Sequence, residues 1–572
     1  MKNNVACITI TYQQLRRLAF SFLLLPVLLF ILFFVKWFIA IPAAAILIWA
    51  FTRAIREETD ETQSFDIPKQ RLLVFGVVCA LWCFLGGQGG LFYQTSDWNE
   101  RNAILRDLIT QNWPVYYPET DTMLTYYIGH WMPAAVVGRV FYLITGGNVS
   151  FAFTIGSLVL GLWTLIGVLT TLMLHICTVR PKHSKGQWLV FWLFLGFSGM
   201  DILGCLLKGW SLPLLLQVQH LEWWSGGYQF SSNTTCLFWV FNQAIPAWIA
   251  TLCFVNEKNN RSYAFIIGCA LLSASLPCVG LAILMLGKVA WDVIGAVKSG
   301  TVKEYIRRTF SFVNVGSTAV LVPIIGSYLL SNSALENTAA GENAPPAAEL
   351  TVPMIVIVAG LALLAVAAIF FRAYSANTLR RKDFSKFSAG SAILLIMMVL
   401  MICLHPETRR IYFVFLFLEC GLYWFLLAGD FWDDLYFYLI GATLVICPLI
   451  KVGISADFCM RASLPALTIL TTMCGKKLCA WQTVGKNARD RRNKFNWRYI
   501  TCTLLIACLI IGAATPVMEI LRGFINVVME GSLGLSADSI YTLNQYHSSG
   551  GIYGNFVSES YRSSLFFRFF AS

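Results

Sequence analysis

Long apolar runs follow one another along almost the whole chain, and they constrain its fold more than any other feature. A run of about 20 apolar residues can cross a bilayer as an α-helix, because a helix satisfies its own backbone hydrogen bonds. Of the 572 residues, 57% are hydrophobic and 13% are charged, whereas soluble domains carry about 25% charged residues. The sequence therefore predicts an all-α polytopic membrane protein with roughly 12–14 transmembrane helices.

The positive charges indicate how the chain is oriented. Its formal net charge of +12 comes with Lys and Arg residues gathered in short loops, such as 54–70 and 476–498. Under the positive-inside rule these loops are cytoplasmic, and so is the N-terminus. This placement of charge gives no reason to expect nucleic acid as a partner. The basic loop 180–185 must also lie inside, which favours a re-entrant or juxtamembrane helix over a full crossing for residues 123–145.

Three parts follow from this topology. Residues 1–71 are predicted to form a transmembrane hairpin and a cytoplasmic loop, residues 72–518 the main transmembrane module, and residues 519–572 an extracytoplasmic tail. The module opens with the largest external loop, 89–133. Proline and glycine in the stretch 275–280 interrupt a later apolar run, so two short half-helices are expected there.

The first external loop carries charges that the end of a membrane helix does not need. Asp97 comes first after the helix, and a carboxylate at the membrane surface can act as a general base; Glu100 is the second acid. Alternatively, Asp97 caps a short amphipathic helix that lies on the lipid headgroups. The aromatic stretch 113–118 suits either the wall of a sugar site or an interface belt. His130 is either a satisfied core residue or a ligand.

A second polar stretch, between residues 201 and 243, combines flat aromatic side chains with groups that hydrogen-bond hydroxyls. Asp201 lies inside an apolar run, where a carboxylate indicates a functional site. A polar helix cap beside an aromatic belt is the alternative. No cofactor is certain, but Asp97, His220 and Glu222 are candidate ligands for a divalent metal without a compact metal motif. The predicted substrate-binding residues are His130, Asp201, His220, Glu222, Trp223, Trp224, Tyr228, Asn233 and Gln243.

A third group consists of arginines on the predicted outer side, against the positive-inside trend. Arg409 and Arg410 follow one apolar run, and Arg461 lies near another. Since a guanidinium group matches phosphate oxygens in a bidentate manner, a lipid-linked phosphate would explain all three. Local ion pairs, such as Asp457 with Arg461, are the alternative.

These features together resemble the GT-C superfamily of integral membrane glycosyltransferases. The resemblance rests on the inward N-terminus, the many spans, the juxtamembrane helices and the acidic start of the first external loop, Ser96-Asp97-Trp98 to Arg101. The paired prolines followed by Gly-Lys of the mannosyltransferases are absent, and so is the WWDYG-type motif of the oligosaccharyltransferases. The resemblance therefore identifies no subfamily, donor sugar or acceptor.

The resemblance implies a bacterial enzyme of the cell membrane with its active site outside. It would transfer a sugar from a polyprenyl-phosphate-linked donor to an envelope glycan, lipid or protein, with Asp97 as general base. A transporter or flippase for a lipid-linked or anionic substrate is the rival hypothesis. A non-catalytic assembly protein with the same architecture is a third.

Overall fold

The structure is a computed structural model. It describes residues 6–57, 63–211, 220–334, 407–450, 452, 456–488, 497–531, 533–534, 540–548 and 553–572. Within these residues seven helices are long and apolar enough to cross a membrane, and a bent helix pair would make eight. This confirms the predicted class of helical, multi-pass membrane protein. The runs 351–371 and 388–404, also expected to cross, lie outside the described residues.

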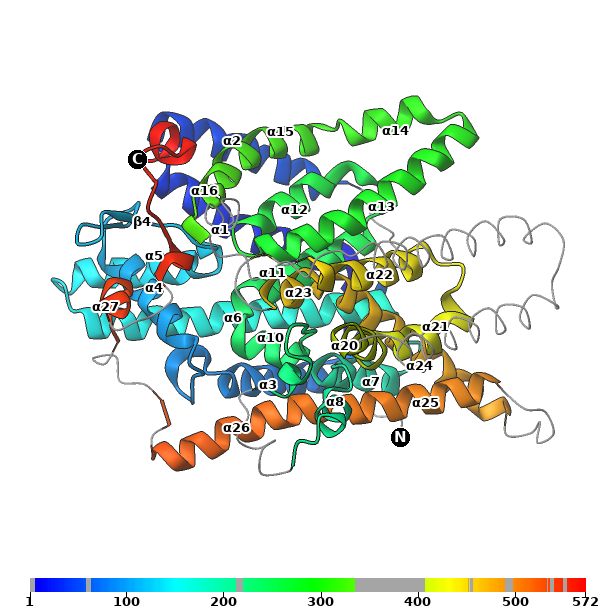
Figure 1. Cartoon of the computed structure of the whole chain (residues 1–572). Coiled ribbons are helices and arrows are strands. Elements are labelled where there is room, and N and C mark those ends of the chain that lie inside the picture. Colours follow the sequence, from blue (N-terminus) through cyan, green and yellow to red (C-terminus); the bar gives the residue numbers. More distant parts are fainter. Residues whose placement is uncertain are drawn as a thin grey trace.

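Helices make up most of the described chain, with five short strands (Figure 1). Long helices such as α6, α25 and α26 run across the page in this view. In chain order the elements are β1 (Cys7–Thr11), α1 (Tyr12–Phe34), α2 (Trp37–Ala54), β2 (Ser64–Pro68), α3 (Lys69–Leu85), α4 (Trp98–Thr110), β3 (Tyr116–Tyr117), β4 (Thr122–Leu124), α5 (Met132–Ile144), α6 (Val149–Val179), α7 (Ser184–Gly196), α8 (Asp201–Leu207), α10 (Asn233–Trp239), α11 (Phe241–Asn256), α12 (Tyr263–Leu271), α13 (Ser275–Ser299), α14 (Val302–Thr309), α15 (Phe312–Leu321), α16 (Ser327–Leu330), α20 (Glu407–Leu416), α21 (Leu422–Phe431), α22 (Leu435–Ile446), α23 (Asp457–Ala462), α24 (Leu464–Ala488), α25 (Trp497–Gly512), α26 (Ala514–Glu530), α27 (Leu543–Ser548) and β5 (Val557–Ser558).

The N-terminal hairpin begins with a capping box. The Thr11 hydroxyl accepts a hydrogen bond from the backbone N–H of Gln14 (3.2 Å), and the Gln14 side chain accepts one from the N–H of Thr11 (3.0 Å). Such a box satisfies two backbone donors that the first turn of a helix leaves free. Strand β1 just before it pairs antiparallel with β2, so the start of α1 lies beside Gln63, while the start of α3 lies beside Ala6 at the other end of the two strands.

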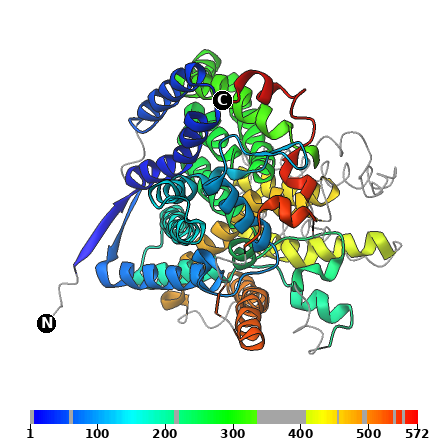
Figure 2. The same ribbon diagram turned by 90° about the vertical axis from the view of Figure 1, so that its left-hand side faces the viewer.

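One end of the helical body is formed by the first loop and the C-terminal segment. Strand β4 pairs with β3 on one side and with β5 on the other, in a three-stranded sheet. The last residues then reach the turn between α1 and α2, where the N–H of Lys36 donates to the Phe570 carbonyl at 2.8 Å. These parts gather at the left of Figure 1 and face the viewer in Figure 2. We call this the tail end.

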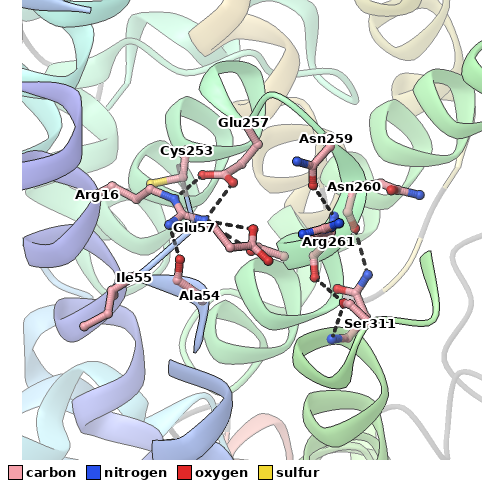
Figure 3. Close-up of polar contacts among 12 residues, drawn as sticks. Arg16, Ala54, Ile55, Glu57, Cys253, Glu257, Asn259, Asn260, Arg261 and Ser311 are labelled. Atoms are coloured by element: carbon pink, nitrogen blue, oxygen red, sulfur yellow. Dashed lines mark hydrogen bonds and ion pairs between the residues drawn. The ribbon is translucent and has the colours of Figure 1, made fainter. Parts of the chain in front are cut away.

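The opposite end carries loops 178–185, 256–262 and 298–308, and we call it the basic end. Arg16 is fully buried there and binds both carboxylate oxygens of Glu257, with Nε–Oε1 2.6 Å and Nη2–Oε2 2.8 Å (Figure 3). Its Nη1 donates to the Ala54 carbonyl. This bidentate pair joins α1 to the end of α2 and to the connection between α11 and α12.

The structure places one helix break differently from the sequence prediction. Residues 275–280 are helical, and α13 continues from Ser275 for 25 residues, long enough to cross a membrane. The expected pair of half-helices is therefore wrong. The chain breaks just before, at residues 272–274, so Pro277 lies in the first turn of α13. A proline is tolerated there, because the first turn needs no N–H donor.

The segment 123–145 does not form one long helix. It consists of strand β4, a turn and the 13-residue helix α5. At about 1.5 Å per residue α5 is about 20 Å long, shorter than the ~30 Å core of a bilayer. A second break lies between α7 and α8, which are bent by 41°. This bend places Asp201 at the start of α8, in the interior of the protein.

Candidate functional site

Asp97 lies at the N-cap position of α4, but its side chain accepts no hydrogen bond from the helix backbone. Instead, its Oδ2 binds Nη2 of Arg101, one turn further on, at 2.9 Å. The Asp97 side chain is 46% exposed and the Arg101 side chain only 5%. The guanidinium group lies over the ring of Phe241 on α11, 5.8 Å from its centroid. Its Nε and Nη1 have no hydrogen-bond partner among the described residues.

A second pair of the same kind lies on the short helix α23. Asp457 Oδ2 binds Nη1 of Arg461 at 2.7 Å, again one turn apart. The carboxylate is again the exposed member, at 39%, and the guanidinium group is the buried one, at 10%. Nε of Arg461 has no partner in the described part of the chain. Burial acts to lower the pKa of Arg461, but Asp457, Tyr127 and Tyr126 together outweigh it and the net shift is upward, so this group stays charged.

The charges of both pairs act on Tyr126, which packs against Tyr127 with their ring centroids 4.2 Å apart. Burial raises the pKa of Tyr126, and the charges of Arg461 and Arg101 both act against that shift. Arg461 also acts on Tyr127. Two charged pairs from distant parts of the chain therefore lie in the same region of the protein, although no contact between the pairs is found among the described residues. We call these six residues the arginine site: Asp97, Arg101, Tyr126, Tyr127, Asp457 and Arg461.

The sequence predicted Asp97 and Arg461 as parts of one site; in the structure each belongs to an ion pair of its own, and that they form one site stays a prediction. Arg101, Tyr126 and Tyr127 were not predicted as site residues. A signal for Arg101 exists in the sequence, because Asp97 and Arg101 have the same four-residue spacing as Asp457 and Arg461.

The alternative prediction, in which the amphipathic helix after Asp97 lies on the lipid headgroups, is wrong. Helix α4 is covered on several faces, and the side chain of Asp107 on it is fully buried. Glu100 faces the tail, where its charge acts on Tyr546. Burial raises the pKa of Glu100, with Asp97 adding to the shift. The aromatic stretch 113–118 also packs within the protein, with Trp113 against Phe34 at 5.5 Å.

Two buried amides follow Phe241 on α11. Neither the oxygen nor the nitrogen of the Asn242 and Gln243 side chains has a hydrogen-bond partner among the described residues. Buried polar groups in proteins are nearly always paired. His130 packs edge-on against the same Phe241 ring at 5.3 Å, and its Nε2 lies 3.1 Å from the Thr164 hydroxyl. The alternative of a core histidine is thus the one the structure supports.

Glu222 is held by its own loop. Its carboxylate accepts hydrogen bonds from Gln229 Nε2 (2.8 Å), Ser231 Oγ (2.6 Å) and the backbone N–H of Ser232 (2.8 Å). Burial raises the pKa of Glu222 to about 7, and the negative charge of Asp201 adds to that shift. These contacts fix the loop rather than leave Glu222 free to bind a ligand.

Asp201 and Glu419 form a buried pair of carboxyl groups. Asp201 Oδ2 accepts hydrogen bonds from Ser198 Oγ (3.0 Å) and Thr515 Oγ1 (2.8 Å), while Glu419 Oε1 accepts one from Trp224 Nε1 (3.0 Å). The two carboxyl groups are close enough to hydrogen-bond each other. Ionised carboxylate oxygens only accept, so that bond forms only when one group carries a proton. The sequence had suggested no role for Glu419.

His220 lies apart from both Asp97 and Glu222, against helix α26. Its Nδ1 is 3.5 Å from Oε1 of Glu519, and its ring packs 4.0 Å from that of Trp239 and 4.9 Å from that of Trp223. Glu519 also binds Arg522 at 2.9 Å. The candidate metal set of Asp97, His220 and Glu222 is therefore wrong, and no group of three potential ligands occurs within the described ranges.

The remaining predicted residues are packing residues or lie outside the description. Asn233 Nδ2 donates to the Phe194 carbonyl at 2.7 Å, and Tyr228 packs against Tyr412 at 5.4 Å. Helix α20 includes Arg409 and Arg410, whose side chains are not described. Of the predicted site residues, the arginine site therefore contains only Asp97 and Arg461. The aromatic residues that were expected beside them, Trp223, Trp224 and Tyr228, are not part of it.

Comparison with known proteins adds no relative. No family model, no curated protein and no solved structure matches this chain.

Proposed function

We propose that the chain is a membrane glycosyltransferase of the GT-C type, which transfers a sugar from a polyprenyl-phosphate-linked donor. The observation that carries this proposal is the arginine site. Two buried guanidinium groups, whose free nitrogens have no hydrogen-bond partner among the described residues, lie there in the same region as the half-exposed carboxylate of Asp97. Phosphate oxygens are the natural partners of such nitrogens.

In the proposed reaction Asp97 takes the proton of the acceptor hydroxyl. The acceptor oxygen then forms a bond with the anomeric carbon of the sugar, and the bond between that carbon and the phosphate oxygen breaks. The electron pair leaves with the polyprenyl phosphate. Arg101 and Arg461 stabilise the negative charge that develops on this leaving group. The unpaired amides of Asn242 and Gln243 are candidates for holding the sugar hydroxyls.

The proposal assigns the tail end to the extracytoplasmic side of the cell membrane. The cations of the basic end support this assignment, because cytoplasmic loops are enriched in Lys and Arg. It also accounts for the tail, since residues 540–548 and 553–572 pack against the first loop, which carries Asp97.

A transporter is the second candidate, and the pair of Asp201 and Glu419 favours it. Paired carboxyl groups inside a membrane protein commonly carry protons in pumps and transporters. In this alternative the arginine site binds an anionic substrate, and a proton on the carboxyl pair moves with it. The two hypotheses differ in which residues are essential.

The test compares Asp97→Asn and Arg461→Gln with the wild-type chain and with Asp121→Asn. Asp121 is the matched control, because it is a carboxylate of the same loop, 49% exposed and paired with Arg562. Envelope glycans and lipids of cells that carry each variant are profiled by mass spectrometry at equal protein levels. The purified proteins are then assayed for sugar transfer from polyprenyl-phosphate donors.

We expect Asp97→Asn to reduce transfer by about a hundredfold or more, since general-base catalysis contributes at least that much. Arg461→Gln should also lose transfer, and Asp121→Asn should keep it. If Asp97→Asn keeps the wild-type glycan profile, the transferase proposal is wrong. If, in addition, Asp201→Asn makes a complete lipid-linked intermediate accumulate, the transporter hypothesis is correct.

A further inference from the structure

Helices α13 and α14 form a hairpin at the basic end, and its second helix stays largely uncovered. The chain turns at Gly300, whose backbone is left-handed (φ 71°), and α14 after it contains no buried residue. The Tyr305 hydroxyl donates to the Val289 carbonyl at 3.5 Å, which holds α14 against α13. The hairpin lies at the upper right of Figure 1, opposite the tail end.

Two exposed tryptophans indicate where this hairpin leaves the apolar part of a bilayer, because Trp is enriched at membrane–water interfaces. Trp49 near the end of α2 is 52% exposed, and Trp291 on α13 is 50% exposed. Phe312 at the start of α15 packs on Trp49, with their ring centroids 4.3 Å apart. Residues 292–310, which we call the hairpin tip, lie between Trp291 and Phe312 in the chain. The hairpin tip therefore lies at the level of the lipid headgroups.

The acids of the hairpin tip are already paired, and several of its cations are not. Asp292 binds Lys288 at 2.5 Å, and Glu304 binds Arg308, each pair one turn apart on its own helix. Three further cations of the hairpin tip are exposed: Lys298, Lys303 and Arg307. None of these three side chains forms an ion pair or a hydrogen bond with a described residue. The hairpin tip therefore presents three uncompensated positive charges.

An apolar stripe runs along α14 beside two of these cations. Val302, Ile306 and Phe310 follow one another at four-residue spacing, so they share one face of the helix. Ile306 is 50% exposed and Phe310 is 70% exposed. Lys303 and Arg307 each come one residue later, about 100° further around the helix. An exposed apolar stripe flanked by cations is typical of a helix that lies at a membrane surface.

We propose that the hairpin tip binds anionic lipids of the leaflet at the basic end. The three cations complement the headgroup phosphates, and the apolar stripe is covered by the lipid below them. A water-soluble anion would satisfy the cations but would leave Ile306 and Phe310 in contact with water. The positive-inside rule assigns this end to the cytoplasm, and the cytoplasmic leaflet is the one whose anionic lipids attract clusters of Lys and Arg.

The test places the photo-cross-linking residue p-benzoylphenylalanine at position 310, where it keeps an aromatic side chain. The purified full chain in neutral detergent is titrated with phosphatidylglycerol or with phosphatidylcholine, and the lipid attached after irradiation is measured by mass spectrometry. The variant combines Lys303→Gln with Arg307→Gln, and it should fold because α14 has no buried residue. The matched control combines Lys182→Gln with Lys185→Gln, which removes two exposed cations from another loop of the basic end.

We expect phosphatidylglycerol to reach half-maximal attachment at a concentration about a hundredfold lower than phosphatidylcholine, about fivefold for each of the three cations. The double variant should need about 25 times more phosphatidylglycerol, and the control should behave like the unsubstituted chain.

Three outcomes would overturn the proposal. Equal half-maximal concentrations for the two lipids would exclude a preference for anionic lipid. An equal shift in the variant and the control would exclude the hairpin tip as the site. Attachment of residue 310 to a protein rather than to lipid, after irradiation of intact cells, would show that a protein covers the hairpin tip instead. None of these results depends on the proposed sugar transfer at the other end of the protein.

Discussion

Protonation of Asp107 is expected to stabilise the folded protein, because this carboxyl group is buried where the tail meets the first loop. Its Oδ2 accepts hydrogen bonds from the Tyr117 hydroxyl (2.8 Å) and from the backbone N–H of Leu543 (2.9 Å). Its Oδ1 has no partner among the described residues. The side chain is fully buried, so a negative charge on it is only partly compensated.

The size of the effect follows from the pKa. Burial raises the pKa of Asp107 from 3.8 to about 6, although the two hydrogen bonds and Arg106 act in the opposite direction. The unfolded chain therefore releases this proton near pH 4 and the folded chain near pH 6. The stabilisation is fully present below about pH 4 and is lost as the pH rises to about 6, by about 3 kcal/mol in total.

Asp107→Asn tests this reasoning, because asparagine keeps an oxygen that accepts both hydrogen bonds and does not titrate. Thermal unfolding of the purified proteins in detergent is measured from about pH 4 to about pH 8. The variant should match the wild type at the acidic end and exceed its stability by about 3 kcal/mol at the basic end. Asp121→Asn is the control with the opposite sign, since hydrogen bonds from Tyr116 and Tyr561 lower the pKa of Asp121.

Two outcomes would refute the reasoning on Asp107. If the wild type and Asp107→Asn show the same dependence of stability on pH, this group does not titrate as its burial implies. If the variant is less stable than the wild type near pH 8, the negative charge itself stabilises the contact with the tail.

Further predictions concern packing. Glu257→Gln removes the closer of the two carboxylates that pair with buried Arg16 and leaves only Glu57, at 3.8 Å, so we expect a loss of up to about 3–5 kcal/mol in thermal unfolding. A Cβ at residue 280 would overlap the carbonyl oxygen of Ala462, so Gly280→Ala should lower stability by about 1–3 kcal/mol. Gly295→Ala on the same helix is its control, since nothing lies within 4 Å of its Cβ position and alanine favours helix by up to about 1 kcal/mol. Equal melting temperatures for Gly280→Ala and the wild type would contradict the close approach of α13 and α23.

The sequence predicts most of the helices because apolar length and capping are local features. Helices α1, α2 and α6 begin and end within a few residues of the apolar runs 18–35, 38–53 and 150–177 that the sequence predicts to cross, except that α1 begins earlier, at its capping box. The break before α13 was misplaced because a proline in the first turn of a helix looks, in sequence, like a proline that interrupts one.

The site was predicted only in part, since its contacts are long-range. Asp97 and Arg461 were predicted as site residues because each is a charge in a position where a membrane protein does not ordinarily carry one. Arg101 was missed because a charged residue on a short amphipathic helix resembles one that faces water. Helices α5 and α6 bury that helix together with the tail, which docks at Leu543 on Asp107, and no local pattern reports such contacts.

The net charge of the arginine site leads to one last prediction. The two ion pairs are neutral overall, with each carboxylate matched to one guanidinium group. In the proposed reaction Asp97 takes the acceptor proton and becomes neutral, so the site would gain one net positive charge. That gain would coincide with the negative charge developing on the leaving phosphate, which stabilises the transition state more than the ground state.

Asparagine at residue 97 imitates the protonated aspartic acid, so Asp97→Asn should bind the product, polyprenyl phosphate, more tightly than the wild type does, while transfer is lost. The released Arg101 can then donate to the phosphate, and a hydrogen bond to a charged group is worth about 1.5–3 kcal/mol, or at least about tenfold in affinity. Binding of a short-chain polyprenyl phosphate, measured by calorimetry, checks the prediction, and Arg101→Gln should weaken it. Weaker binding by Asp97→Asn would mean that the carboxylate orients Arg101 rather than competing with the phosphate for it. The proposed link between proton uptake by Asp97 and stabilisation of the leaving phosphate would then be wrong.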